Sequence, residues 1–133
     1  MSELCPCGSI LKYNVCCEPY VIGEKIASSP GILMRSRYSA YVKHNVDYLI
    51  ISWHPDCHAE KFRTMLIQCD TEWHGLIVIK EMAGSHTDEG FVEFCAGFTD
   101  RNTTKTSMIY ECSRFLRLKK RWYYIDGISK YSR

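Results

Sequence analysis

Four cysteines lie within thirteen residues near the start of the chain, in the stretch CPCGSILKYNVCC (5–17). Cys5 and Cys7 form one close pair, and Cys16 and Cys17 form a second pair after eight intervening residues. Thiols at this density could form disulfides, a redox centre or a metal site. A structural zinc ion takes four thiolate or imidazole ligands in a tetrahedron, and two close pairs can supply all four.

The two alternatives to a metal site fit this spacing less well. Adjacent cysteines such as Cys16 and Cys17 cannot bond each other without strain, and disulfides persist in oxidising compartments. A redox motif of the C-x-x-C kind is absent, because only Pro6 separates Cys5 from Cys7. The sequence therefore predicts one structural zinc ion bound by Cys5, Cys7, Cys16 and Cys17.

The residues between the two pairs suit a short metal-binding loop. Pro6 stiffens the first pair, and Gly8 can adopt a positive φ that turns the chain back toward the sulfur atoms. Ser9 is predicted to cap a single helical turn that returns Cys16 and Cys17 to the metal. Four thiolates would leave no open position for an activated water, so the zinc is expected to be structural and not catalytic.

The whole chain has the composition of a globular protein. Its 133 residues are 46% hydrophobic and 24% charged, which fits one ordinary domain with a short appended module. No stretch approaches the ~18 apolar residues of a membrane span. The first residues lack the basic and apolar regions of a signal peptide. We therefore expect a cytoplasmic protein without a membrane span, whose thiols stay reduced.

Helical periodicity follows the cysteine segment, and the predicted division is a zinc module over residues 1–22 and a second domain over residues 23–133. Ser29 and Pro30 form a helix start, after which apolar side chains recur at helical spacing. A shorter helix is expected to end at Pro55, with Trp53 and His54 closing it. A third helical segment is predicted over residues 56–69.

An alternating pattern replaces the helical one after Asp70. The predicted strands cover residues 72–83, 90–99, 106–118 and 120–128. Their short, turn-rich connections imply antiparallel pairing, so the expected class is α+β, with helices packed on one face of a curved antiparallel sheet. Residues 92, 94, 96 and 98 share one apolar face of the second strand. Both faces of the third strand are mixed, and the pattern does not decide which one points inward.

These stretches together resemble a known family. The pattern C-x-C-x8-C-C, with Gly8 and Ser9 after the second cysteine and an aromatic residue at Tyr13, is similar to the SEC-C zinc-binding motif. With KYNVCCEPY, LMRSRYSAYV, DYLIISWHP and RWYYIDG, the chain resembles the YchJ family of bacterial proteins from residue 4 to about residue 128.

The resemblance implies a nuclear-transport-factor-two-like domain, a conical α+β fold that encloses a pocket, after the zinc module. It carries the four zinc ligands over to the same cysteines. The chain departs from the pattern at Ile10, where many such motifs have glycine.

Several residues are candidates for a pocket inside the implied cone. They are Trp53, His54, Tyr110, Arg114 and Trp122. His54 could cap a helix end or act as an acid–base group. Arg114 could pair with Asp126 or hold an anionic ligand. Arg35 and Arg37 lie in a helix packed inward, and we expect them to be solvated or bound to carboxylates of the zinc module.

The remaining cysteines and histidines give weaker signals. The spacing of His54, Cys57, His58 and Cys69 matches no standard metal cluster. Cys95 and Cys112 lie among aromatic and aliphatic residues of predicted strands, so we expect buried, inert thiols.

Positive charge is concentrated at the end of the chain. Residues 114–133 carry seven basic groups and one acidic group, a net charge of +6 within a chain total of +2. Lys119, Lys120 and Arg121 are the candidate partner-binding residues, because such a cluster attracts acidic proteins or RNA. The alternative is a solvated hairpin tip.

Two functions remain open from the sequence. The favoured one is a zinc-binding module that docks on a protein or ribonucleoprotein partner through the zinc segment and the basic strand. The alternative is a small-molecule-binding protein, or a metal-independent enzyme, that uses the cone cavity. The sequence contains no P-loop, nucleotide fingerprint or catalytic triad, which favours binding over catalysis.

Overall fold

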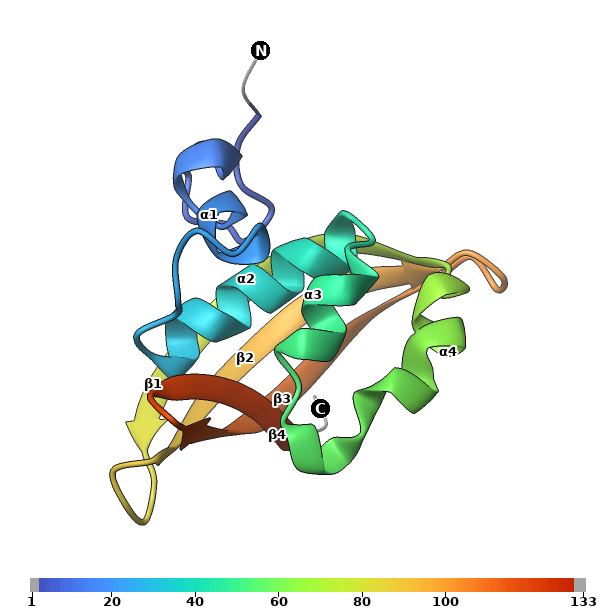
Figure 1. The fold of residues 1–133 in the computed structure, drawn as a ribbon. Helices are drawn as coiled ribbons and strands as arrows, with labels where there is room; N and C mark the ends of the chain where they lie inside the picture. The colour runs from blue at the N-terminus through green and yellow to red at the C-terminus, as the bar shows by residue number, and fades with distance from the viewer. Residues whose placement is uncertain (1–2, 131–133) are drawn as a thin grey trace.

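The computed structural model describes residues 3–130 and has an α+β architecture (Figure 1). The helices lie against one face of a four-stranded antiparallel sheet whose strand order follows the chain, β1-β2-β3-β4. This confirms the predicted fold class. Arg133, one of the basic groups counted above, lies outside the described residues.

The four strands lie close to their predicted positions. They are β1 (Thr71–Ala83), β2 (Glu89–Asp100), β3 (Lys105–Leu118) and β4 (Arg121–Lys130). The register of β1 against β2 shifts between Trp73 and Gly75 and again between Val78 and Lys80. Such irregularities bend a strand and increase its twist, which helps the sheet to curve around the helices.

The structure defines which face of β2 and of β3 points toward the helices. Val92, Phe94 and Ala96 of β2 are buried there, as the alternation predicts. In β3 the inward residues include Ser113 and Phe115, which are also buried. Because neighbours in a strand point to opposite faces, Tyr110, Cys112 and Arg114 lie on the outer face.

The main helix, α2 (Pro30–Val42), begins where predicted. The hydroxyl of Ser29 accepts a hydrogen bond from the backbone N–H of Ile32 at 3.2 Å, and Pro30 is the first helical residue. The next helix, α3 (Val46–Ile51), is capped by the side chain of Asn45. Side-chain oxygens of this kind satisfy the free N–H groups of a first helical turn.

The segment after α3 differs from the predicted helices. Residues 52–54 are not helical: the N–H of His54 donates to the carbonyl of Tyr124 at 2.7 Å, and the N–H of Tyr124 donates to the carbonyl of Ser52 at 3.0 Å. These bonds join the helical layer directly to β4, and this tertiary pairing explains why α3 ends before Trp53.

The predicted third helix is instead three short pieces. They are the 3-10 turns η2 (Pro55–Cys57) and η3 (Ala59–Phe62) and the helix α4 (Arg63–Ile67). His58 interrupts the run with a left-handed conformation, φ 49° and ψ 53°. A residue in that conformation ends a helix, so the apolar period alone overestimated its length.

Residues 3–22 form a small segment at one end of the molecule, above α2 (Figure 1). Its only regular elements are the 3-10 turn η1 (Tyr13–Val15) and the short helix α1 (Glu18–Val21), with a single β-bridge between Leu4 and Lys12. Within residues 3–130, no helix is long and apolar enough to cross a membrane.

Two apolar clusters stabilise the fold. One lies between the helices and the sheet and includes Leu33, Leu49, Val92 and Phe115. The other joins the N-terminal segment to the domain: the buried Cys5, Cys7 and Cys17 pack with Tyr38, Leu76, Phe94 and Ala96. The cysteines are therefore part of a shared core and not an appendage on a linker.

Candidate metal centre

The four N-terminal cysteines converge in space. The sulfur atoms of Cys5, Cys7, Cys16 and Cys17 all lie within 4.8 Å of one another, and those of Cys7 and Cys16 are 3.7 Å apart. Sulfur ligands 2.3 Å from a tetrahedral metal lie about 3.8 Å from each other. All eight cysteines are free thiols. The donor set and its spacing therefore fit a metal ion after small side-chain adjustments.

The loop between the pairs depends on its backbone conformation. Gly8 has φ +84°, as predicted, and a Cβ at this position would lie 3.1 Å from the carbonyl oxygen of Leu76. Glycine is therefore required both for the turn and for close approach to β1. Ile10, which replaces the usual glycine, also has a positive φ of 64°, a strained conformation for a β-branched residue.

Ser9 has a different role from the predicted helix cap. Its hydroxyl lies 3.1 Å from the sulfur of Cys16 and accepts a hydrogen bond from the N–H of Leu11. The residue preceding η1 is Lys12, and no side chain caps the turn. Because η1 begins four residues after Ser9, the Ser9 hydroxyl is used for sulfur and not for helix N–H groups.

Helix α2 supplies the second layer around the sulfur atoms. The hydroxyl of the fully buried Ser39 lies 3.4 Å from the sulfur of Cys5. The guanidinium of Arg35 donates to the carbonyl of Cys7 at 2.9 Å, whereas a carboxylate or solvent was expected. Groups of this kind orient metal ligands. Arg35 and Ser39 are four residues apart and so share one helix face, a signal that the sequence did contain.

The thiols depend strongly on each other's protonation. Hydrogen bonding from Cys17, helped by Ser9 and Cys5, lowers the pKa of Cys7 to about 4 despite its burial. The same hydrogen bond, together with burial, raises the pKa of Cys17, and burial raises that of Cys16. One thiolate is thus stabilised by neighbouring protonated thiols. Four thiolates together require a cation, and metal binding releases the remaining protons.

The pocket candidates are not brought together. Trp53 lines a cavity between α2 and the sheet, whereas Trp122 lines a separate small niche. His54 is buried, and its Nδ1 accepts a hydrogen bond from the N–H of Asp56 at 3.1 Å, so it caps the start of η2 and not, as expected, the C-terminal end of the preceding helix. Tyr110 lies on the outer face of β3 and does not line the cavity.

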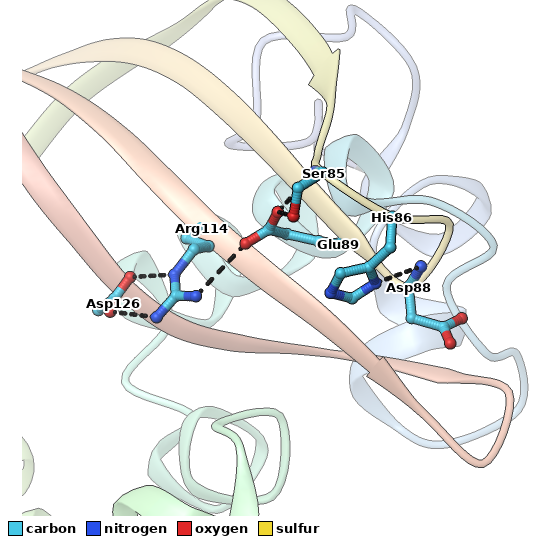
Figure 2. A network of polar contacts seen from close by, with 6 residues as sticks. All are labelled: Ser85, His86, Asp88, Glu89, Arg114 and Asp126. Atoms are coloured by element: carbon cyan, nitrogen blue, oxygen red, sulfur yellow. Dashed lines mark hydrogen bonds and ion pairs between the residues drawn. The ribbon is translucent and has the colours of Figure 1, made fainter.

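Arg114 lies in a polar network on the outer side of the sheet (Figure 2). Its Nε and Nη2 donate to the carboxylate of Asp126 at 3.0 and 2.9 Å, and Nη1 lies 3.4 Å from Glu89. The guanidinium lowers the pKa of Asp126. Glu89 also accepts hydrogen bonds from the backbone and hydroxyl of Ser85. The expected ion pair with Asp126 is therefore confirmed, and Arg114 joins β2, β3 and β4, but the expectation of an inward position is wrong.

Arg37 is the arginine that points inward, onto the wall of the cavity between α2 and the sheet. From the sequence, it was predicted to be solvated or bound to a carboxylate. Its side chain is only 4% exposed. Nη1 donates to the carbonyl of Leu49 at 2.8 Å and to the hydroxyl of Ser52 at 2.6 Å. Position 37 lies one helical turn after the buried Leu33, so the spacing in the sequence already places it on the inward face of α2.

The remaining cysteines form no second centre. Among the described residues, the four N-terminal cysteines are the only cluster of three or more side chains arranged to hold a metal. Cys57 contacts the carbonyl of Ile125, and Cys69 contacts the hydroxyl of Thr71. Cys95 is buried as expected, and Cys112 is partly buried on the outer face.

The basic residues near the chain end occupy the β3–β4 hairpin. Lys119 and Lys120 form its two-residue turn, with φ values of 52° and 69°. Both are exposed, as is Arg121, and none of the three forms an ion pair within the part of the chain that the structure describes. Arg117, beside them, is paired with Asp88.

Comparisons with known proteins agree with this architecture. A family model described as "YchJ, middle NTF2-like domain" matches residues 29–127, and one described as "SEC-C motif" matches residues 1–19. A UPF0225 protein of Yersinia pestis is 61% identical over 130 residues, which cover 96% of this chain and 84% of that protein.

Two solved structures are similar over nearly the whole chain. A SEC-C motif containing protein from Rhodopseudomonas palustris is 28% identical with a TM-score of 0.85, over 97% of this chain and 100% of the other. A SEC-C motif containing protein from Psychrobacter arcticus is 25% identical with a TM-score of 0.77, over 98% of this chain and 84% of the other.

Proposed function

Since the chain belongs to the YchJ family and carries its SEC-C motif, we propose that it is a docking protein organised by zinc. In this proposal a zinc ion bound by Cys5, Cys7, Cys16 and Cys17 fixes residues 3–22 as a rigid surface, and that surface binds a protein partner. The metal has a structural role, because four sulfur ligands leave no position for substrate or water.

Zinc is supported by the donor chemistry. Four closely spaced thiolates in a tetrahedral arrangement suit zinc or an iron–sulfur centre and disfavour magnesium or calcium, which prefer oxygen ligands. The sulfur spacing of one ligand pair, 3.7 Å between Cys7 and Cys16, fits a single ion. Metal analysis of the purified protein distinguishes the two metals, with one zinc per chain and no iron expected.

The observation that carries the docking proposal is the apolar surface of the N-terminal segment. Five aliphatic side chains of this short segment are exposed: Leu4 by 63%, Ile10 by 81%, Leu11 by 53%, Val15 by 64% and Ile22 by 57%. The backbone bridge between residues 4 and 12 brings their segments side by side. Grouped exposed apolar side chains mark interaction surfaces in soluble proteins.

The basic hairpin continues this surface. Tyr20 of the cysteine segment and Lys25, three residues after its end, line the same small niche as Arg121 of β4. Lys119 and Lys120 follow at the hairpin tip, unpaired among residues 3–128. The partner that fits is a protein with an apolar patch bordered by carboxylates. RNA is disfavoured because the apolar side chains are aliphatic and not aromatic, and bases stack on aromatic rings.

The test is affinity capture from native lysate, with mass spectrometry of the captured proteins before and after nuclease treatment. The informative variants are Ile10→Asp/Val15→Asp and Lys119→Glu/Lys120→Glu/Arg121→Glu. The matched controls are Ile77→Asp/Ile79→Asp, two exposed residues of β1, and Lys80→Glu/Arg101→Glu/Lys105→Glu, three exposed cations elsewhere.

A directly captured protein partner should be lost with both informative variants and kept with both controls, and nuclease should not release it. Retention of every partner by both informative variants would refute the docking surface. Release of all partners by nuclease would show that RNA, and not protein, is bound.

A further inference from the structure

A cavity of about 270 Å³ lies between α2 and the inner face of the sheet. This volume is near the lower end for small-molecule pockets, about 300 Å³. Its walls are mostly aromatic: Tyr38, Tyr41, Trp53, Trp73, Phe94 and Tyr124. The only charged side chains on the wall are those of Arg37 and Glu111.

Arg37 is a buried cation without a carboxylate partner among residues 3–128. Nη1 uses its hydrogens on the carbonyl of Leu49 and the hydroxyl of Ser52. The guanidinium also contacts the rings of Trp53 and Tyr124, with centroids 5.2 and 4.8 Å away. The side chain of Tyr41, on the same cavity wall, is a further hydrogen-bonding partner of the guanidinium. Burial of an unpaired charge is costly, so the cavity side of Arg37 suits an anionic group.

Glu111 provides the opposite charge on the same wall. Its carboxylate accepts a hydrogen bond from the hydroxyl of Ser113 at 2.8 Å. A Cβ at position 127 would lie 2.3 Å from this carboxylate, so Gly127 leaves the space that it occupies. Among the described side chains, no cation forms an ion pair with Glu111. The two charges line one cavity and do not neutralise each other.

We propose that this cavity binds a small zwitterion with a planar apolar body, the chemistry of an aromatic amino acid. The ligand carboxylate would supply the counterion that the guanidinium of Arg37 lacks, the ligand ammonium would pair with Glu111, and the apolar body would lie against the aromatic walls. This inference goes beyond the docking function and does not depend on it. A simple anion would face the carboxylate of Glu111, and a simple cation would face Arg37.

The test uses three compounds with one common body: L-phenylalanine, 3-phenylpropionate and phenethylamine. Each is titrated into the metal-loaded protein, and the indole N–H signals of the tryptophans are followed by NMR. L-Phenylalanine should bind at least tenfold more tightly than either partial analogue. The signals of Trp53 and Trp73 should shift, whereas that of Trp122, outside the cavity, should stay.

Two variants separate the two charges. Glu111→Gln should lower the affinity for L-phenylalanine to that for 3-phenylpropionate, and Arg37→Met should lower it to that for phenethylamine. Glu72→Gln and Arg101→Met, at exposed positions, are the matched controls and should bind as the unaltered protein does.

The proposal is overturned if the three compounds bind equally. It is overturned likewise if none of them binds at about 10 mM, a concentration at which even weak ligands are detected. It is also overturned if Glu111→Gln, which leaves the helix contacts of Arg37 intact, binds L-phenylalanine unchanged. That variant keeps the test decisive even where Arg37→Met fails to fold.

Discussion

The N-terminal segment and the α+β domain are stabilised in different ways. The domain buries Leu49, Val92 and Phe115 almost completely, which is the usual hydrophobic core. The segment of residues 3–22 leaves most of its aliphatic side chains exposed and buries three of its cysteines instead. A chain of about 20 residues cannot form a sufficient core of its own. In the proposed function, metal ligation would therefore supplement packing, and the aliphatic side chains would remain available for a partner.

The comparison also shows how the two parts meet. Cys5, Cys7 and Cys17 pack against Tyr38 and Phe94 of the domain, so the candidate metal site shares a buried cluster with the domain. The dependence is expected to run one way: the segment needs the domain surface and the metal, whereas the domain has a second cluster without cysteines.

The largest effect should follow removal of the metal. Structural zinc sites contribute about 10–16 kcal/mol of apparent binding free energy to a small fold, and Cys7→Ser removes one ligand. We expect loss of the metal and of ordered NMR signals from residues 3–22, with the signals of β2 and β3 retained. Metal analysis and two-dimensional NMR measure both, and Cys112→Ser is the control. Global unfolding would show that the two parts are one cooperative unit.

A substitution in the core of the domain should have the opposite pattern of effects, with lower stability and unchanged metal binding. Phe115→Ala leaves a cavity at a fully buried position and should reduce the free energy of unfolding by about 3–5 kcal/mol. Chemical denaturation followed by circular dichroism gives this value. At denaturant concentrations below the unfolding transition, the metal content should not change. A loss of metal there would mean that metal binding by the four cysteines depends on the core around Phe115.

The contacts of α2 with the cysteines test whether the domain contributes to metal affinity. Ser39→Ala removes the α2 hydroxyl near Cys5, and loss of such a group typically costs about 10–100-fold in metal affinity. Competition with a chelator measures the affinity, and Ser28→Ala, an exposed serine before α2, is the control. Equal affinities for both variants would mean that the segment holds its metal without help from α2.

The strained residue of the metal loop offers a change in the opposite direction. Ile10 has φ 64°, and a left-handed conformation costs an L-residue about 1–2 kcal/mol relative to glycine. Ile10→Gly should therefore slow metal loss to a chelator by up to about tenfold, against Leu11→Gly as the control. A faster loss than in the unaltered protein would show that the loop does not carry this strain.

The smallest effect is expected at the outer ion pairs. Arg114 lowers the pKa of Asp126, so this carboxylate stabilises the fold above its unfolded pKa, near 3.8, and the contribution is lost as the pH falls through the lowered folded value. Asp126→Asn should cost less than about 1 kcal/mol at pH 7, because the pair is solvent-screened. The difference from the unaltered protein should vanish at low pH, and an unchanged difference there would contradict the assignment. Asp70→Asn is the control.

Features encoded within a few residues of sequence could be predicted. The cysteine pairs, the Ser29 cap and the alternation of β2 each depend on local spacing. The errors arose where a distant segment decides the outcome: the pairing of residues 52–54 with β4 ended α3 early. Likewise, the inward face of β3 follows from how α2 lies on the sheet, which no short pattern contains.

The shared core of the cysteines has a consequence for the order of synthesis. The cysteine segment leaves the ribosome before the domain that follows it, and Phe94, against which it packs, follows Cys17 by 77 residues. At about 5–20 residues per second, this is a delay of roughly 4–15 seconds. During that interval the thiols are without the domain surface that later covers them, so the cysteine segment is made before the domain but reaches its final surroundings only after the domain has been made.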